Sequence, residues 1–145
     1  MNSEERLKMY SFELKNDLSE LETLRQNLEN YAQCIGLCEK CIFEINLGLE
    51  ELITNIISYG FKDNLEHLIK IKIRRNNKTL ILYVEDDGLP FNPLEVKRPE
   101  HPCDPENIRI GGLGIYIIKK LMDDIFYERC ECKNKLTLKK KIETN

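Results

Sequence analysis

Residues 47–61, with the sequence LGLEELITNIISYGF, decide the fold of this chain. Their apolar residues recur at helical spacing, so we expect a helix with one stripe facing a core. Glu51 and Asn55 lie four residues apart and therefore stack on one face of that helix. Asn55 also stands where the apolar pattern would place another hydrophobic side chain. The pair predicts a helix that lines a pocket; the alternative is an asparagine that only hydrogen-bonds its own helix.

The chain before this helix predicts one strand and a further helix. Residues 10–14 alternate between apolar and polar, which is typical of a short edge strand. Leucines at helical spacing over residues 18–31 predict a first helix that ends at Gly36. Its leucine face could pack into the core or form a homodimer contact, and the sequence alone leaves both open. The second helix runs over about residues 37–59, where Gly60 stops it.

Two hairpins and a short helix follow in the second half of the chain. Residues 67–74 and 79–85 alternate cleanly and are expected to pair through a turn at Asn76 and Asn77. A short helix is predicted over residues 113–122. Two strands are predicted over residues 125–132 and 135–142, with Lys133 and Asn134 in the turn between them.

These elements predict one α+β domain over residues 1–145. The fold is a two-layer α/β sandwich, in which a mostly antiparallel sheet of four or five strands is covered on one face by helices. No periodicity survives from residue 87 to residue 111, and all five prolines lie between Pro90 and Pro105. A loop this long inside a small domain is usually functional, as a lid or a binding loop.

The composition is that of a globular protein that works in water. The chain is 41% hydrophobic and 32% charged, with a net charge of −3, and its charges of both signs are interspersed. This pattern argues against a nucleic-acid partner, and no apolar run reaches the roughly 20 residues of a membrane span. Without a signal-peptide pattern, we expect a cytoplasmic protein. Without a secretion signal, its six cysteines are expected to be reduced thiols that are buried or half-buried. A zinc site is disfavoured, because the spacing does not give two C-x₂-C pairs.

Two further stretches suit a ligand. Residues 86–88, Asp-Asp-Gly, follow directly on a strand, where a carboxylate beside a glycine fits the amino group of a flat base. An ordinary Asp-Gly turn is the alternative. Residues 111–114, Gly-Gly-Leu-Gly, open a helix, whose exposed N–H groups and positive dipole end favour phosphates. The alternative there is a flexible junction between loop and helix.

Together these stretches are more specific than any one of them. The helix with Glu-x-x-x-Asn, the strand-end Asp-x-Gly, the long loop and the glycine-opened helix occur in that order in one small domain. A carboxamide with phosphate oxygens is a suitable magnesium environment, because Mg²⁺ takes few protein ligands and keeps its waters. The combination predicts a site for Mg-ATP.

The sequence resembles a known family at these positions. The stretches look like those of the gyrase, heat-shock chaperone and histidine-kinase ATPase superfamily, the Bergerat fold. Within it, the chain is most similar to the small anti-sigma-factor serine-protein kinases of bacteria. The likeness rests on EELITN at residues 50–55, DDGLPFNP at 86–93, GGLGIY at 111–116 and LMD at 121–123.

The resemblance implies a role for each matching residue. Glu51 would be the general base for the attacking hydroxyl, and Asn55 would coordinate magnesium. Glu50 is the rival base, but it points about 100° away from Glu51 on a helix. The implied nucleotide contacts come from Asn55, from Asp86 on the adenine amino group, and from Gly88, Arg109, Gly112, Leu113 and Gly114, under an ATP lid of about residues 90–111.

The activity implied by the resemblance is that of an anti-sigma regulatory factor. Such a protein kinase uses ATP to phosphorylate a serine or threonine on a STAS-type anti-sigma-factor antagonist, and it can also bind a sigma factor. A second hypothesis is a binding module that switches partners with ATP but transfers no phosphate. A third, the detached ATP-binding half of a histidine kinase, lacks a dimerisation helix with a phosphoacceptor histidine.

Overall fold

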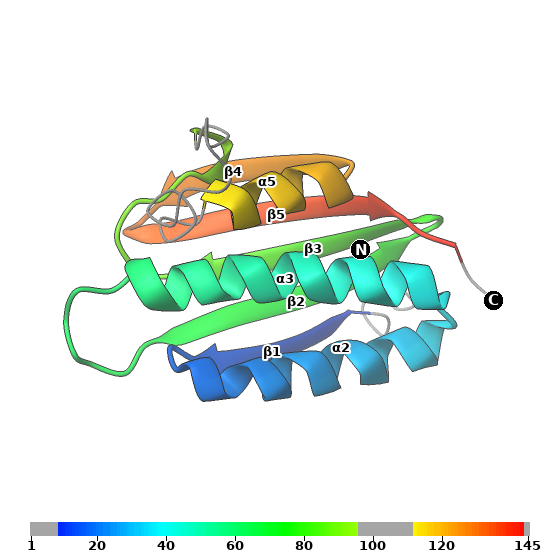
Figure 1. Cartoon of the computed structure of the whole chain (residues 1–145), viewed down its shortest axis with the longest axis horizontal. Helices are drawn as coiled ribbons and strands as arrows, with labels where there is room; N and C mark the ends of the chain where they lie inside the picture. The colour runs from blue at the N-terminus through cyan, green and yellow to red at the C-terminus, as the bar shows by residue number, and fades with distance from the viewer. Residues whose placement is uncertain (1–8, 96–111, 144–145) are drawn as a thin grey trace.

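The computed structural model describes residues 9–95 and 112–143. In this part of the chain, three α-helices cover one face of a five-stranded antiparallel sheet with the strand order β1-β2-β3-β5-β4 (Figure 1). The strands are β1 (Tyr10–Lys15), β2 (Leu68–Asn76), β3 (Thr79–Asp86), β4 (Asp124–Cys130) and β5 (Lys133–Lys141). The helices are α2 (Leu21–Ile35), α3 (Glu39–Tyr59) and α5 (Gly112–Leu121), with 3₁₀ turns η1 (Leu18–Glu20) and η2 (Pro93–Glu95). The predicted two-layer α+β sandwich is confirmed.

Local sequence signals set the limits of α2. Asp17 accepts a hydrogen bond from the backbone N–H of Ser19 at 2.9 Å and starts the turn that leads into the helix. Gly36 ends the helix with a φ of 67°, a left-handed conformation that glycine adopts without strain. The leucine stripe faces the core, where Leu24 and Leu28 are buried. Those leucines therefore serve the packing of their own chain.

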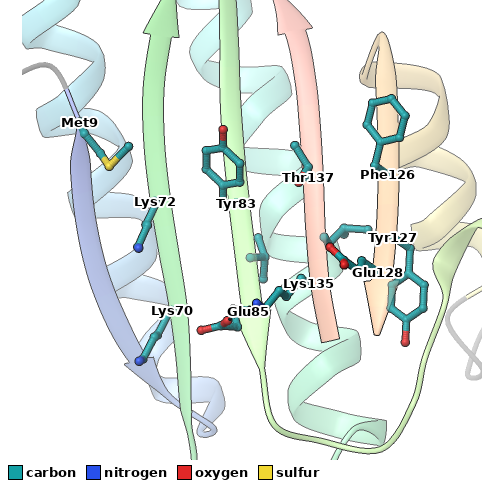
Figure 2. A pocket seen from close by; sticks show the side chains of 12 residues that line it. Met9, Lys70, Lys72, Tyr83, Glu85, Phe126, Tyr127, Glu128, Lys135 and Thr137 are labelled. Atoms are coloured by element: carbon teal, nitrogen blue, oxygen red, sulfur yellow. Dashed lines mark ion pairs between the residues drawn. The ribbon is translucent and has the colours of Figure 1, made fainter. Parts of the chain in front are cut away.

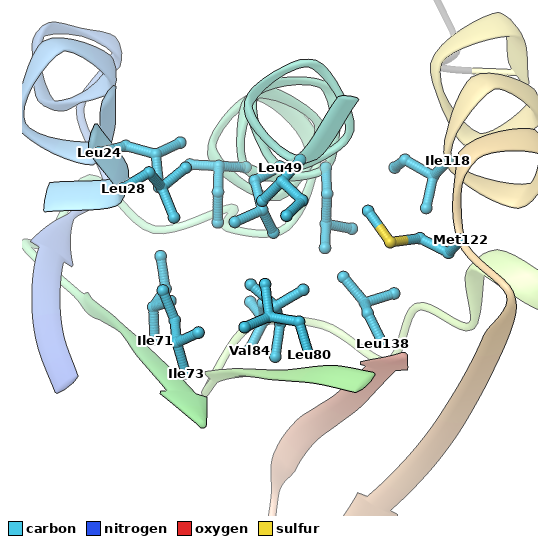
Figure 3. Packing of buried hydrophobic residues seen from close by; sticks show 14 of the residues in the cluster. Leu24, Leu28, Leu49, Ile71, Ile73, Leu80, Val84, Ile118, Met122 and Leu138 are labelled. Carbon is cyan, nitrogen blue, oxygen red and sulfur yellow. The ribbon is translucent and has the colours of Figure 1, made fainter. Parts of the chain in front are cut away.

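The middle helix, α3, carries the centre of the core. Leu49, Leu52 and Ile53 are at most 1% exposed. Figure 3 shows side chains from all three helices pointing toward the strands below them. Burial of each such side chain contributes about 1.5–3 kcal/mol to the free energy of folding. Gly60 ends the helix as predicted, but with a φ of −81°; a Cβ there would lie 2.5 Å from the carbonyl oxygen of Ile56.

The first hairpin joins β2 to β3 and is close to the prediction. The isoleucines of β2 are buried on the helix side, and the lysines between them are exposed on the other side. Asn76 is still part of the ladder, where it pairs with Thr79. The turn is formed by Asn77 and Lys78, one residue later than predicted, with Asn77 at a φ of 55°. Asparagine tolerates this left-handed conformation better than most residues.

The second hairpin, between β4 and β5, corrects the sequence prediction. Lys133 and Asn134 do not form the turn, because both lie in β5. The turn is made by Glu131 and Cys132, which have φ values of 52° and 63°. Asn134 consequently pairs across the sheet with Asp86. This shift of two residues brings an unexpected amide beside the strand-end carboxylate.

A buried charge joins the two layers. Lys140 lies on the inner face of β5 and is 7% exposed. Its Nζ donates hydrogen bonds to Glu44 of α3 at 2.5 Å and to the carbonyl oxygen of Leu121 at the end of α5 at 2.8 Å. Buried ammonium groups persist only when they are paired in this way. Lys140 therefore links β5 to both helices.

The predicted lid, about residues 90–111, falls mostly outside the described residues. Its first part contains η2, where the side-chain oxygen of Asn92 accepts a hydrogen bond from the backbone N–H of Leu94 at 2.9 Å. Among the helices of residues 9–95 and 112–143, none is long and apolar enough to cross a membrane.

Candidate functional site

Asp86 is a buried carboxylate at the end of β3, on the side of the sheet that faces the helices. It is 5% exposed. Within the described residues, its two hydrogen-bond donors are the backbone N–H of Gly88 at 2.9 Å and Nδ2 of Asn134 at 3.0 Å, and both reach Oδ1. Burial raises the pKa of Asp86, and these two hydrogen bonds oppose the rise. The arrangement holds Oδ1 in place and leaves Oδ2 for a ligand.

Asn134 is the residue of this site that the sequence did not reveal. Besides Asp86, its Nδ2 donates to the carbonyl oxygen of Leu89 at 2.8 Å. Its Oδ1 accepts from the backbone N–H of Phe91 at 3.3 Å and from the hydroxyl of Tyr127 at 2.5 Å. One buried amide thus fixes the carboxylate and the start of the loop behind it.

A small cavity lies between α3 and the sheet beside these groups. Its volume is about 20 Å³, which is room for about one water molecule. Aliphatic side chains of α3, β3 and β5 form most of its wall, and two aromatic rings close it. The lining residues are Leu52, Ile56, Val84, Asp86, Phe91, Tyr127, Asn134 and Leu136.

Gly88 lies where the loop after β3 touches the end of α3. A Cβ at Gly88 would lie 2.5 Å from the carbonyl oxygen of Gly60, which is too close for any side chain. The same carbonyl accepts a hydrogen bond from the backbone N–H of Leu89 at 2.7 Å. The glycine is therefore required by this close backbone approach, which fixes the carboxylate loop against the helix.

Glu51 and Asn55 of α3 face Gly114 of α5. A Cβ at Gly114 would lie 2.6 Å from Oε2 of Glu51 and 3.3 Å from Nδ2 of Asn55. Asn55 is 8% exposed, and its buried Nδ2 has no hydrogen-bond partner among the described residues. A buried amide without a partner is unfavourable by about 1–3 kcal/mol. Such a group indicates a ligand at this place.

The two clusters share one end of α3. Leu52 and Ile56, which line the cavity at Asp86, each follow directly on Glu51 and Asn55 in the sequence. Successive residues of a helix are turned by about 100°. The cavity and the contact with α5 therefore lie on adjacent faces of the same two turns, and α3 brings together the stretches that the sequence singled out.

The other predicted site residues are placed less completely. Gly112 and Leu113 are the first two residues of α5, as the prediction of a glycine-opened helix requires. Arg109 lies outside the described residues. Glu50, the rival base, is turned about 100° from Glu51 on α3, and its charge is one of several that raise the pKa of Arg25 in α2.

The helix-free face of the sheet carries a separate groove of about 430 Å³ (Figure 2). Lys70, Lys72, Tyr83, Thr137 and Phe126 are among the residues that line it. Although it is larger than the cavity at Asp86, none of the predicted site residues that the structure describes lies in it. We therefore place the candidate site on the helix side.

Comparison with known proteins identifies the family of the chain. The family model described as the histidine kinase-like ATPase domain matches residues 14–140. The chain belongs to the histidine kinase-like ATPase family. The matched residues contain β2 to β4, all three helices and nearly all of β5, so the family match covers every described element of the candidate site.

Curated relatives within this family are bacterial protein kinases. The serine-protein kinase RsbW of Oceanobacillus iheyensis is 30% identical over 105 residues, which cover 70% of this chain and 66% of that protein. RsbW of Listeria monocytogenes serovar 1/2a is 32% identical over 106 residues, covering 70% of this chain and 67% of that protein. The serine/threonine-protein kinase BtrW of Bordetella bronchiseptica is 25% identical over 96 residues, covering 66% and 68%. The chain matches about two thirds of the length of these relatives.

Two solved structures have the same fold. One contains the RsbU and RsbW domains of Rv1364c from Mycobacterium tuberculosis, with a TM-score of 0.64 at 13% identity, covering 92% of this chain and 32% of that one. The other is the catalytic domain of the histidine kinase ThkA, with a TM-score of 0.53 at 16% identity, covering 94% and 99%. At these identities, the likeness concerns the fold.

Proposed function

We propose that this histidine kinase-like ATPase domain binds Mg-ATP and phosphorylates a serine or threonine on a STAS-type anti-sigma-factor antagonist. The observation that carries the proposal is the meeting of two clusters at one end of α3. Asp86 with its buried amide partner lies on one side, and Glu51 with Asn55 against Gly114 lies on the other. The names of the relatives support the same chemistry.

The adenine end of ATP belongs at Asp86. Oδ2 of this carboxylate accepts a hydrogen bond from the adenine amino group, while Asn134 and Gly88 hold Oδ1. A charged hydrogen bond of this kind contributes about 1.5–3 kcal/mol once it is out of water. Since the cavity holds about one water molecule, binding of the purine requires the cavity to widen.

The phosphates and the metal belong between α3 and α5. The residues present fit a magnesium ion bound together with phosphate. The amide oxygen of Asn55 is a ligand type that Mg²⁺ accepts, its buried Nδ2 lacks a partner among the described residues and suits a phosphate oxygen, and Gly114 leaves the space beside it free of a side chain. Oδ1 of Asn55 would hold the ion, which supplies neutralisation of phosphate charge when bound. Gly112, Leu113 and Gly114 present the backbone of the first turn of α5 to the phosphates, and Arg109, which lies outside the described residues, stays a predicted phosphate contact.

Glu51 is the proposed general base. Its carboxylate lies at Gly114 beside Asn55, where the terminal phosphate belongs, and it accepts the proton of the attacking hydroxyl. Glu50 is turned about 100° away from Glu51 on the same helix and is therefore the matched control. Phosphoryl transfer needs mainly positioning and charge neutralisation, which one carboxylate and one metal supply.

We propose two protein partners: a STAS-type antagonist as the phosphate acceptor and a sigma factor. The homodimer stays a prediction. The leucine stripe first considered for its contact is buried within the chain, so a dimer would have to use another surface.

Labelling with radioactive ATP tests the proposal. The purified chain is incubated with Mg²⁺, γ-labelled ATP and the STAS proteins encoded beside it. We expect label on one STAS protein, loss of label with Glu51→Gln, and retained label with the control Glu50→Gln. Nucleotide binding, measured by calorimetry, should be retained in both variants.

The same assay separates the second function. A chain that binds ATP and a STAS protein but transfers no label to any candidate is a partner-switching module without catalysis. Equal labelling by wild type and Glu51→Gln would contradict the assignment of the base.

A further inference from the structure

Two cysteines mark the N-terminal end of α3, far from the candidate site. They form the sequence Cys38-Glu39-Lys40-Cys41, with Cys38 as the N-cap and Cys41 in the first turn. The sulfur of Cys38 accepts a hydrogen bond from the backbone N–H of Cys41 at 3.4 Å. Cys38 is half-buried, whereas Cys41 is 7% exposed.

The environments of the two thiols differ in a useful way. The hydrogen bond from the backbone N–H of Cys41 lowers the pKa of Cys38, and the thiol of Cys41 adds a second hydrogen bond with the same effect. Burial raises the pKa of Cys41. Cys38 is therefore favoured as the reactive thiolate, and Cys41 is favoured as the thiol that attacks second.

The two residues are already in direct contact, because the sulfur of Cys38 lies 3.4 Å from the backbone nitrogen of Cys41. Disulfides join Cα atoms about 4.4–6.8 Å apart, a separation that residues three apart at the start of a helix can reach. Metal binding is not the alternative within the described residues, where no three His, Cys, Asp or Glu side chains are grouped to hold an ion.

The other cysteines provide a contrast. All five cysteines in the described part of the chain are free, as predicted, but Cys34 and Cys132 are exposed, which corrects the expectation of burial. Neither caps a helix: Cys34 lies inside α2 and Cys132 in the β4–β5 turn. Cys34 and Cys132 therefore serve as control thiols, because neither lies at a helix N-terminus and neither has a second cysteine three residues away.

We propose that Cys38 and Cys41 form a redox-active pair that reacts with hydroperoxides and closes to a reversible disulfide. The thiolate of Cys38 attacks the peroxide, so that a sulfur–oxygen bond forms as the oxygen–oxygen bond breaks, and the leaving oxygen takes a proton to become water or an alcohol. The sulfur of Cys41 then attacks the sulfenic acid. The disulfide forms as hydroxide leaves, and the proton of the Cys41 thiol converts that hydroxide to water. Two electrons pass from the two sulfurs to the peroxide, and a dithiol returns them.

The reaction changes contacts at the end of the chain. The backbone N–H of Glu143 donates to the sulfur of Cys41 at 3.4 Å, and the backbone N–H of Cys38 donates to the carbonyl oxygen of Glu143 at 3.0 Å. The sulfur of Cys41 that would form the disulfide is therefore in contact with the backbone of Glu143. Glu51 lies ten residues beyond Cys41, or about 15 Å along the helix, so the sulfur chemistry is separate from the nucleotide site.

Peptide mapping tests the proposal directly. Lys40 lies between the two cysteines, so trypsin cuts between them. The full chain is treated with hydrogen peroxide near pH 7, its remaining thiols are alkylated, and it is digested without reduction. We expect the two peptides that flank Lys40 to be joined, to separate on treatment with dithiothreitol, and to stay separate when Cys38→Ser or Cys41→Ser is oxidised. Cys34 falls in the same tryptic peptide as Cys38, so the control Cys34→Ser must keep the joined product.

A rate measurement keeps the test independent of folding defects in the variants. In the wild type, Cys38 should be alkylated at pH 7 at least about tenfold faster than Cys34 or Cys132, because its lowered pKa raises the fraction of thiolate. In Cys41→Ser, dimedone should trap the sulfenic acid at Cys38. Faster oxidation of Cys34 or Cys132 than of Cys38, or oxidation of Cys38 straight to the sulfinic acid in the wild type, would overturn the proposal.

Discussion

Replacement of Asn134 with alanine removes the buried amide that joins the carboxylate of Asp86 to the loop behind it. The change deletes hydrogen bonds of 3.0 Å to Asp86 and 2.8 Å to the carbonyl of Leu89. It also removes the acceptor of the backbone N–H of Phe91. The side chain is 6% exposed, so water does not readily replace these partners.

The expected loss of stability can be worked out from these contacts. A hydrogen bond to a charged group contributes about 1.5–3 kcal/mol, and a neutral one contributes about 0.5–1.5 kcal/mol. We expect Asn134→Ala to lower the free energy of unfolding by about 2–4 kcal/mol. Since the bond from Asn134 opposes the effect of burial, the variant should also have a higher pKa at Asp86.

The pH dependence of stability tests the hydrogen bond between Asn134 and Asp86. Burial already raises the pKa of Asp86 in the fold, so protonation of this carboxyl favours the folded state at low pH, and that contribution is lost as the pH rises through the folded pKa. With the pKa raised further, Asn134→Ala should be more destabilised relative to wild type near pH 8 than near pH 4. Urea unfolding at the two pH values measures the difference.

A double-mutant cycle with Asp86→Ala isolates the pair. The coupling free energy between the two sites should be about 1.5–3 kcal/mol, the value of one charged hydrogen bond. If the two changes add within about 0.5 kcal/mol, and the effect of Asn134→Ala does not vary with pH, then Asn134 acts only through packing and the loop. That result would refute its role as the residue that positions Asp86.

Two further predictions concern the surroundings of the site. Asp63 at 2.6 Å and Asp87 at 2.9 Å form hydrogen bonds with His67 and raise its pKa. The wild type should therefore be more stable than His67→Gln, with the full difference present below about pH 6.5 and lost as the pH rises through the raised pKa. Urea unfolding near pH 6 and pH 9 tests this, and a difference that is flat with pH would contradict it. Gly114→Ala should change stability by no more than about 1 kcal/mol, since alanine favours helix. Its methyl group would lie 2.6 Å from the Glu51 carboxylate, so phosphorylation should slow at least about tenfold, and an unchanged rate in the labelling assay would count against this contact.

The fold was predictable because its elements have strong periods. The alternation in β2 and β3 and the apolar stripes of α2 and α3 each continue over many residues, so a single unusual residue does not hide them. The error at the second hairpin has a local cause. Lys133 and Asn134 look like turn residues, whereas Glu131 and Cys132 adopt positive φ values that side chains other than glycine and asparagine rarely take.

That error also hid part of the candidate site. With Asn134 in a turn, nothing in the sequence placed it beside Asp86; in β5, the register of the sheet puts the two opposite each other. One short sequence signal could have placed Asn134 in the strand. If β5 begins two residues earlier than predicted, Asn134 continues the alternation of buried residues formed by Leu136 and Leu138. Glu51 and Asn55 were easier to find, because four residues on a helix define one face without knowledge of any other element.

The most direct test of the account compares two nucleotides that differ at the group Asp86 is proposed to bind. Inosine triphosphate has a carbonyl oxygen in place of the 6-amino group of ATP, so it presents an acceptor where Oδ2 of Asp86 needs a donor. Calorimetric titration with excess Mg²⁺ should show that wild type binds ATP at least about tenfold more tightly than inosine triphosphate, a difference of about 1.4 kcal/mol. In Asp86→Asn this preference should vanish, because an amide can present either a donor or an acceptor. A variant that keeps the full preference for ATP would contradict the placement of adenine at Asp86, and with it the site built around α3.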